Sequence, residues 1–239
     1  MSTSLPERVS PAWIARKSQA GGGMTLTQRV YQTIHDEIVS GALGPGERLV
    51  RRTLSKRLGV SPAPITETLL RLESEGLVEF AALHGSRVRP LQIQDVKNDQ
   101  MLREAIECQA ARLCAEFATG EDLAKLLVDA KPLDRIIARG DRRSQVGLQA
   151  HLEFHVHLAQ YGGYAGLADE LERVWFRQVM RLNWLGETWH RDVPEDWHQQ
   201  LVKVLMSRDP DKAEAKMRDH VRFAKDTERE QFHAFLRGS

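Results

Sequence analysis

Apolar residues recur every three or four positions along most of this chain, which is the spacing of one face of a helix. Three such stretches occur before residue 77, and each is followed by a glycine, a typical helix stop. Their apolar faces are Val30, Ile34 and Ile38 in the first stretch, Leu54 and Leu58 in the second, and Ile65, Leu69 and Leu72 in the third. The chain is therefore predicted to be mainly α-helical.

The second and third stretches are separated by a short turn. Gly59 stands where a helix ends in the left-handed conformation. Ser61 can accept a hydrogen bond from the first turn of the next helix, and Pro62 suits the first position of that helix. This arrangement predicts a helix-turn-helix.

Two short extended runs follow residue 76. They cover Leu77–Phe80 and Ser86–Arg89, on either side of a turn at His84. Their order predicts a small β-hairpin, the wing of a winged helix-turn-helix. Arg87 and Arg89 would share one face of the second strand, where they can reach a DNA backbone or minor groove.

The second half of the chain contains no convincing strand. Its pattern predicts about six helices in an all-α bundle of about 140 residues. Turns are expected at Thr119-Gly120, Arg139-Gly140-Asp141, Gly162-Gly163, Gly186 and Asp209-Pro210.

These patterns divide the chain into four parts. Residues 1–23 are predicted to form a flexible N-terminal arm, and residues 24–90 are predicted to form the winged helix-turn-helix. Residues 91–98 are a predicted linker that turns into a helix at Asp95, and residues 99–237 form the helical domain.

The composition is that of an ordinary soluble protein. Hydrophobic residues make up 41% and charged residues 28%, and the net charge is +1, so any nucleic-acid surface must be local. No apolar run approaches the roughly 20 residues that span a bilayer, and residues 1–23 lack the apolar core of a signal peptide. Cys108 and Cys114 lie on one helical pattern and are interpreted as buried free thiols of a cytoplasmic protein.

Positive charge is concentrated on the first helix of the helix-turn-helix. Five basic residues and no acid lie between Arg48 and Arg57, as a surface that faces phosphates requires. A solvated basic helix inside a structural bundle is the alternative. The joint spacing of Gly59, Ser61, Gly76 and Gly85 favours DNA binding.

Two further motifs precede this region: Ser40-Gly41 at the end of the first helix and the turn Pro45-Gly46-Glu47-Arg48-Leu49. With them, the segment from Leu26 to Pro90 resembles the winged-helix domain of GntR-family transcription regulators.

The resemblance implies that Arg52 contacts DNA. Pro62 and Thr66 stand where the family usually has arginines that do so, and the operator sequence therefore cannot be carried over from relatives. The residues assigned to DNA contact are Arg48, Arg51, Arg52, Ser61, Ala63, Pro64, Thr66, Arg71, His84, Gly85 and Arg87.

Four histidines in the second half form another candidate site. His151 and His155 are spaced i, i+4, so one helix face offers two imidazoles to a metal ion. His198 and His220 lie on later helices. Such pairs also occur on solvated faces, so the spacing alone leaves both interpretations open.

The second half resembles the helical FCD domain of the FadR-like branch of the family, through Phe154-His155, Leu158-Ala159 and the two later histidines. The resemblance implies a divalent metal ion held by His151, His155, His198 and His220, with His151 in place of the usual aspartate. Four imidazoles bring no negative charge, which favours zinc or nickel and a positive site suited to an anionic effector.

Three arginines are assigned to effector binding. Residues 102–107 resemble the first helix of that domain, whose arginine often faces the pocket, so Arg103 would clamp a carboxylate with two hydrogen bonds. Arg177 and Arg181 belong to a stripe that repeats every four residues. A solvated position is the alternative for each of them.

The leading prediction is therefore a transcription regulator rather than an enzyme. A homodimer would bind a palindromic DNA operator, and a small carboxylate at the metal site would change its DNA affinity. The alternatives are a metal-dependent enzyme that uses the histidines and a purely structural metal. Glu153 points away from the face that His151 and His155 share, so the enzyme lacks an evident general base.

Overall fold

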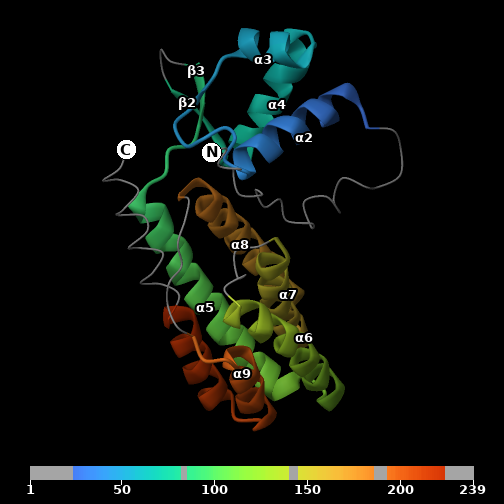
Figure 1. Cartoon of the computed structure of the whole chain (residues 1–239), viewed down its shortest axis with the longest axis vertical. Coiled ribbons are helices and arrows are strands. Elements are labelled where there is room, and N and C mark those ends of the chain that lie inside the picture. The colour runs from blue at the N-terminus through green and yellow to red at the C-terminus, as the bar shows by residue number, and fades with distance from the viewer. Residues whose placement is uncertain (1–23, 82–84, 140–144, 186–192, 224–239) are drawn as a thin grey trace. The chain divides into compact units, whose positions relative to one another are not determined.

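The computed structural model describes residues 24–81, 85–139, 145–185 and 193–223. The chain divides into two units (Figure 1). Unit 1 comprises Met1–Gln92 with Met180–Trp184, and unit 2 comprises Ile93–Val179 with Leu185–Ser239. The predicted arm, residues 1–23, and the end of the predicted helical domain beyond residue 223 lie outside the described residues.

Unit 1 is built on three helices, α2 (Leu26–Val39), α3 (Arg51–Leu58) and α4 (Pro62–Ser74). A capping box begins α2, in which the side chain of Thr25 accepts a hydrogen bond from the backbone of Gln28 and the Gln28 side chain accepts one from the backbone of Thr25. The predicted apolar faces are buried and pack α2 against α4. The fully buried members are Ile34, Ile38, Ile65, Leu69 and Leu72.

The turn between α3 and α4 follows the predicted signals with one exception. Gly59 is left-handed, with a φ of 65°, and it ends α3, while Pro62 opens α4. Ser61 precedes α4 as its N-cap residue, but its side chain makes no capping hydrogen bond. The predicted role of the Ser61 hydroxyl is therefore wrong, and the helix leaves that hydroxyl unused.

A three-stranded antiparallel sheet forms the wing, in the order β1-β3-β2. The predicted hairpin is β2 (Val78–Ala81) and β3 (Gly85–Val88), and its partner β1 (Arg48–Leu49) was not predicted, because two residues show no periodicity. Arg87 of β3 is opposite Arg48 on one side and Glu79 on the other.

Unit 2 is an all-α bundle, as predicted. Its described helices are α5 (Ile93–Phe117), α6 (Gly120–Ala138), α7 (Gln145–Tyr161), α8 (Ala165–Leu185), α9 (Trp197–Met206) and a last helix over 210–223. Both α5 and α6 pack against α7 and α9 (Figure 1). None of the helices in the described ranges is both long and apolar enough to cross a membrane.

The start of α5 corrects the predicted linker over 91–98. The helix begins at Ile93 rather than at Asp95. Asp95 lies in the first turn, where a carboxylate is favourable beside the free backbone N–H groups, so it marks the first turn and not the first residue.

The turn after α7 falls at the predicted glycines. A Cβ atom at Gly162 would lie 3.0 Å from Cβ of Leu113 on α5, so the close approach of the two segments requires glycine. Thr119 caps α6 at the predicted break before it. The predicted turns at Gly140 and Gly186 lie outside the described residues.

Candidate functional site

The four predicted histidines come together inside unit 2. His151 and His155 lie on α7, His198 on α9 and His220 on the last helix. All four are at least 97% buried. One ring nitrogen of each lies within 4.8 Å of the corresponding nitrogens of the others, so the cluster could bind a metal ion.

Tryptophan side chains hold these rings in place. The His220 ring stacks on Trp197 with a centroid distance of 3.9 Å, and His151 meets Trp175 edge-on at 4.8 Å. Trp175 is 2% exposed and belongs to the core of unit 2. Rings packed in this way lose little further freedom when they bind an ion.

Asp134 of α6 is a buried partner of His198 that sequence analysis missed. Its Oδ1 lies 2.7 Å from His198 Nδ1 and accepts the backbone N–H of His198 at 2.9 Å. Its Oδ2 accepts two hydrogen bonds from Gln199, both of 3.1 Å. An acid among the buried apolar positions of α6 was the signal available for it.

Glu107 of α5 is the corresponding missed partner of His155. Its Oε2 lies 2.6 Å from His155 Nδ1, and its Oε1 accepts a hydrogen bond of 2.7 Å from Arg103 Nε. Arg103 and Glu107 are spaced i, i+4, so their pairing was readable from the sequence. The contact with His155 crosses between helices and was not.

Both carboxylates are ionised. Burial raises the pKa of Glu107, but Arg103 and His155 outweigh burial and lower it to about 2. Burial also acts to raise the pKa of Asp134, and the bonds from His198 bring it below its usual value. The four histidines are thus accompanied by two negative charges, which corrects the predicted site without negative charge.

The residues fit a divalent transition metal ion. Imidazole nitrogens suit zinc, nickel and their neighbours, and four of them come within reach of one ion. A carboxylate at Nδ1 fixes the tautomer of the ring and leaves Nε2 for the ion. His155 Nε2 is buried and makes no hydrogen bond with any described residue.

The arginines assigned to the effector are engaged within the protein. Arg103 Nη1 donates to Gln178 at 2.6 Å, and its guanidinium lies 4.3 Å above Trp175. With the bond to Glu107, this leaves only Nη2 of Arg103 for an effector. Arg177 makes a forked ion pair with Asp99, at 2.7 to 3.1 Å.

Arg181, the third of them, is 3% exposed and lies in the segment of α8 that groups with unit 1. Its role at the effector site stays a prediction.

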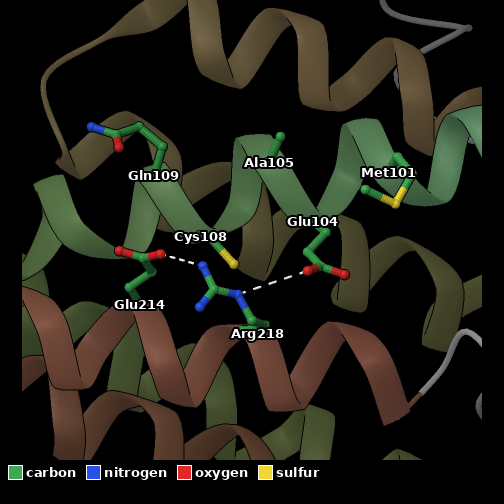
Figure 2. A pocket seen from close by; sticks show the side chains of 7 residues that line it. All are labelled: Met101, Glu104, Ala105, Cys108, Gln109, Glu214 and Arg218. Atoms are coloured by element: carbon green, nitrogen blue, oxygen red, sulfur yellow. Dashed lines mark hydrogen bonds and ion pairs between the residues drawn. The ribbon is translucent and has the colours of Figure 1, made fainter.

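A separate groove of about 250 Å³ lies between α5 and the last helix. Figure 2 shows Arg218 between Glu104 and Glu214: Arg218 pairs with Glu104 across the groove and with Glu214 along its own helix. Its lining residues are Met101, Glu104, Ala105, Cys108, Gln109, Glu214 and Arg218. None of them belongs to the histidine cluster or to its two carboxylates.

The basic residues of α3 form an exposed surface in unit 1. Arg52 and Lys56 make no ion pair or hydrogen bond through their side chains with any described residue. Arg51 is also exposed, with its guanidinium 5.6 Å from the Phe80 ring of β2. Arg57 differs, because it forms an ion pair of 2.6 Å with Glu37.

The residues of α4 assigned to DNA contact differ in exposure. Ser61 and Ala63 are exposed and Thr66 is half-buried, whereas Pro64 is buried. The rotation of α4 turns Pro64 into the core, and its DNA contact stays a prediction.

Arg71, near the end of α4, is bound internally. Its guanidinium lies 3.7 Å above the Tyr31 ring, and Nε donates to Glu75 at 3.1 Å. Arg71 can contact DNA only if its side chain gives up these two interactions.

The residues of the sheet that were assigned to DNA contact lie on β1 and β3. Gly85 is exposed with a φ of 73°, and Arg48 is exposed on β1. Arg87 Nε donates to Glu79 at 2.7 Å, so this ion pair braces the wing. His84 lies outside the described residues.

Two family models match this architecture. The FCD domain matches residues 100–223, more than half of the chain, and the gntR family of bacterial regulatory proteins matches residues 26–88. The chain belongs to the GntR family. The HTH-type transcriptional repressor RspR of Escherichia coli K12 is 25% identical over 217 residues, which cover 86% of this chain and 90% of RspR.

Other relatives agree with this assignment. The regulator McbR of E. coli K12 is 26% identical over 190 residues, which cover 78% of this chain and 85% of McbR. The solved structure of E. coli McbR/YncC has a TM-score of 0.63 at 23% identity, covering 87% of this chain and 99% of that one. A putative GntR regulator from Rhodococcus sp. RHA1 has a TM-score of 0.61 at 21% identity, covering 84% and 96%. At such identities the structural likeness shows the fold alone.

This GntR-family protein is a DNA-binding transcription regulator with an FCD domain. The predicted family and fold are confirmed. The histidine cluster lies within the FCD segment, and the exposed basic helix within the gntR segment. RspR and McbR, two of its relatives, are both transcriptional regulators.

Proposed function

We propose that a small carboxylate, bound at a metal ion in the histidine cluster, controls the operator affinity of this GntR-family regulator. The cluster itself carries the proposal, because four buried imidazole rings converge at the centre of the FCD segment. Zinc or nickel is the ion that these ligands favour. His151, His155, His198 and His220 would hold it.

Charge explains why the effector is an anion. A divalent ion and Arg103 bring positive charge, and Glu107 and Asp134 remove part of it. The remaining charge is about +1, which a single carboxylate neutralises. An ion that accepts a fifth ligand would supply a coordination position for the carboxylate oxygen, and Arg103 Nη2 would donate to it, since the hydrogen bonds of Arg103 use Nε and Nη1.

The same carboxylates favour sensing over catalysis. A catalytic metal site needs a general base that can reach a bound water. Asp134 accepts hydrogen bonds from His198 and Gln199, and Glu107 accepts one from Arg103 and forms an ion pair with His155. Their part is to orient the rings.

A twofold homodimer would present two winged helices to a palindromic operator. One winged helix contacts few bases, and two contacts on related half-sites supply the specificity that a regulator needs. The exposed residues Arg48, Arg51, Arg52, Ser61 and Ala63 would face the DNA. The effector acts only through its preference for one arrangement of the two domains over another.

The test is to measure operator affinity with and without small carboxylates, on metal-loaded and metal-free protein. One class of acid, such as hydroxy acids or sugar acids, should change the affinity of the metal-loaded protein by about 5- to 150-fold. The metal-free protein should not respond. Equal operator affinity for every acid in both forms would refute the proposal, and unfolding of the metal-free protein without any effector response would assign a structural role to the metal.

A further inference from the structure

An apolar stripe is exposed on α4, opposite the face that packs into the core. Ala63, Thr66 and Leu70 are spaced i, i+3 and i+7, so they lie along one side of the helix. Ala63 is exposed and Leu70 is 53% exposed, whereas Ile65 and Leu69 on the other side are fully buried. Burial in unit 1 gives no reason for this stripe.

The stripe lies on the helix that enters a DNA groove. In a helix-turn-helix the second helix occupies the major groove, and its amino-terminal residues contact base edges. The exposed cations Arg52 and Lys56 of α3 lie on the preceding helix, where they can contact phosphates. Duplex DNA is therefore the partner whose charge complements the surroundings of the stripe.

The first two and a half turns of α4, residues 62–70, lack the side chains that make bidentate contacts to purines. Guanine is read in the major groove by arginine or lysine, and adenine by asparagine or glutamine. None of these four residue types occurs between Ser61 and Leu70. The first basic residue of α4 is Arg71, which is bound to Tyr31 and Glu75.

The groups that remain match thymine. Methyl groups of alanine and threonine contact the C5-methyl group of thymine in the major groove. The hydroxyl of Thr66 donates to the carbonyl of Pro62 at 3.0 Å. The methyl group of Thr66 is therefore the part of the side chain that is left for an apolar contact. Glu67 is the only charged residue in these turns, and an acid can accept a hydrogen bond from cytosine but not from guanine O6 or N7.

We infer that α4 reads its operator through thymine methyl groups, with Ala63 and Thr66 as the reading residues. This inference rests on the DNA-binding function of the GntR family and adds the base chemistry of the half-site. Each half-site carries thymine where α4 meets the bases, and guanine is recognised by Arg52 or the wing.

The experiment begins with selection of bound duplexes from a random-sequence pool by the full-length protein. Each thymine of the selected operator is then replaced by deoxyuridine, which removes only the methyl group. One or two replacements in each half-site should weaken binding by roughly three- to tenfold, the value of one buried methyl group. Thr66→Ser, which keeps the hydroxyl and removes the methyl group, should abolish the difference at one of these positions.

Thr33→Ser is the matched control. Thr33 makes the same backward hydrogen bond, to the carbonyl of Arg29 at 2.9 Å, but on α2. Thr33→Ser should leave the loss of affinity at every deoxyuridine replacement unchanged. The inference is overturned if no deoxyuridine replacement changes affinity, or if all duplexes bind alike. It is also overturned if replacing guanines by 7-deazaguanine causes the largest losses of affinity and these losses are undiminished in Arg52→Ala. If all duplexes bind alike, DNA binding itself still stands. If the protein binds no duplex, its function as a regulator is contradicted as well.

Discussion

Replacement of Asp134 by asparagine isolates the part that a buried carboxylate plays at the metal site. Asp134 contacts His198 Nδ1 at 2.7 Å through one oxygen and accepts two bonds from Gln199 through the other. Asparagine has the same shape, but it is neutral. Its side-chain amino group would face a hydrogen-bond donor, either of His198 or of Gln199. The ring of His198 therefore loses the charged partner that sets its tautomer and orientation.

The expected magnitude follows from these contacts. Loss of a carboxylate that orients a metal-binding histidine lowers metal affinity by about 10- to 100-fold. This corresponds to about 1.4 to 2.7 kcal/mol of binding free energy. Because a bound ion stabilises the folded state by mass action, the gap in Tm between metal-loaded and metal-free protein should shrink by roughly 3–10 °C.

The assay is competition for zinc against a chelator of known affinity, with thermal unfolding of both forms. Asp129→Asn is the matched control, because Asp129 is also an acid of α6 and its Oδ2 lies 2.9 Å from Nδ1 of a histidine, His157 of α7. That pair is 39% exposed on both sides and lies outside the cluster, so its loss should leave metal affinity unchanged. The reasoning fails if Asp134→Asn binds zinc within about twofold of the wild type, or if Asp129→Asn weakens binding as much.

Three further predictions concern other parts of the chain. His155→Ala should lower metal content and effector response while the folded protein keeps its operator affinity, and wild-type metal content by elemental analysis would contradict the site. Arg52→Ala should weaken operator binding by about 1–3 kcal/mol in a fluorescence anisotropy titration with the helical circular dichroism unchanged, and unaltered affinity would exclude its contact. Burial raises the pKa of Cys108 to about 11 and that of Cys114 to about 12, so iodoacetamide at pH 8 should alkylate the native protein roughly 100-fold more slowly than the unfolded protein. Rapid labelling of either native thiol would show that burial does not suppress its ionisation.

The fold was largely predictable because its helices carry their own signals. The stripe of α2 and that of α4 each show a complete apolar face, and Gly59 ends α3 in the conformation that it was expected to adopt. The strand β1 could not be predicted, because it is defined by its pairing with β3 and not by a pattern of its own. The burial of Pro64 was missed for a related reason, since it depends on how α4 is rotated against α2.

The candidate metal site was only half predictable. The pair His151 and His155 follows from spacing along one helix. No spacing rule joins Asp134 to His198, or Glu107 to His155, because each contact connects helices that are far apart in sequence. Their absence from the prediction led to the wrong expectation of a site without negative charge.

The origin of the four rings on helices far apart in sequence also determines when the cluster can form during synthesis. His155 precedes His220 by about 65 positions, which a ribosome takes on the order of 3–13 s to add. Through that interval the earlier rings have no complete cluster to join, and ionised Glu107 is already present to hold His155. An ion therefore cannot be held by all four rings until the last helix has been synthesised, so the cluster is completed only near the end of translation.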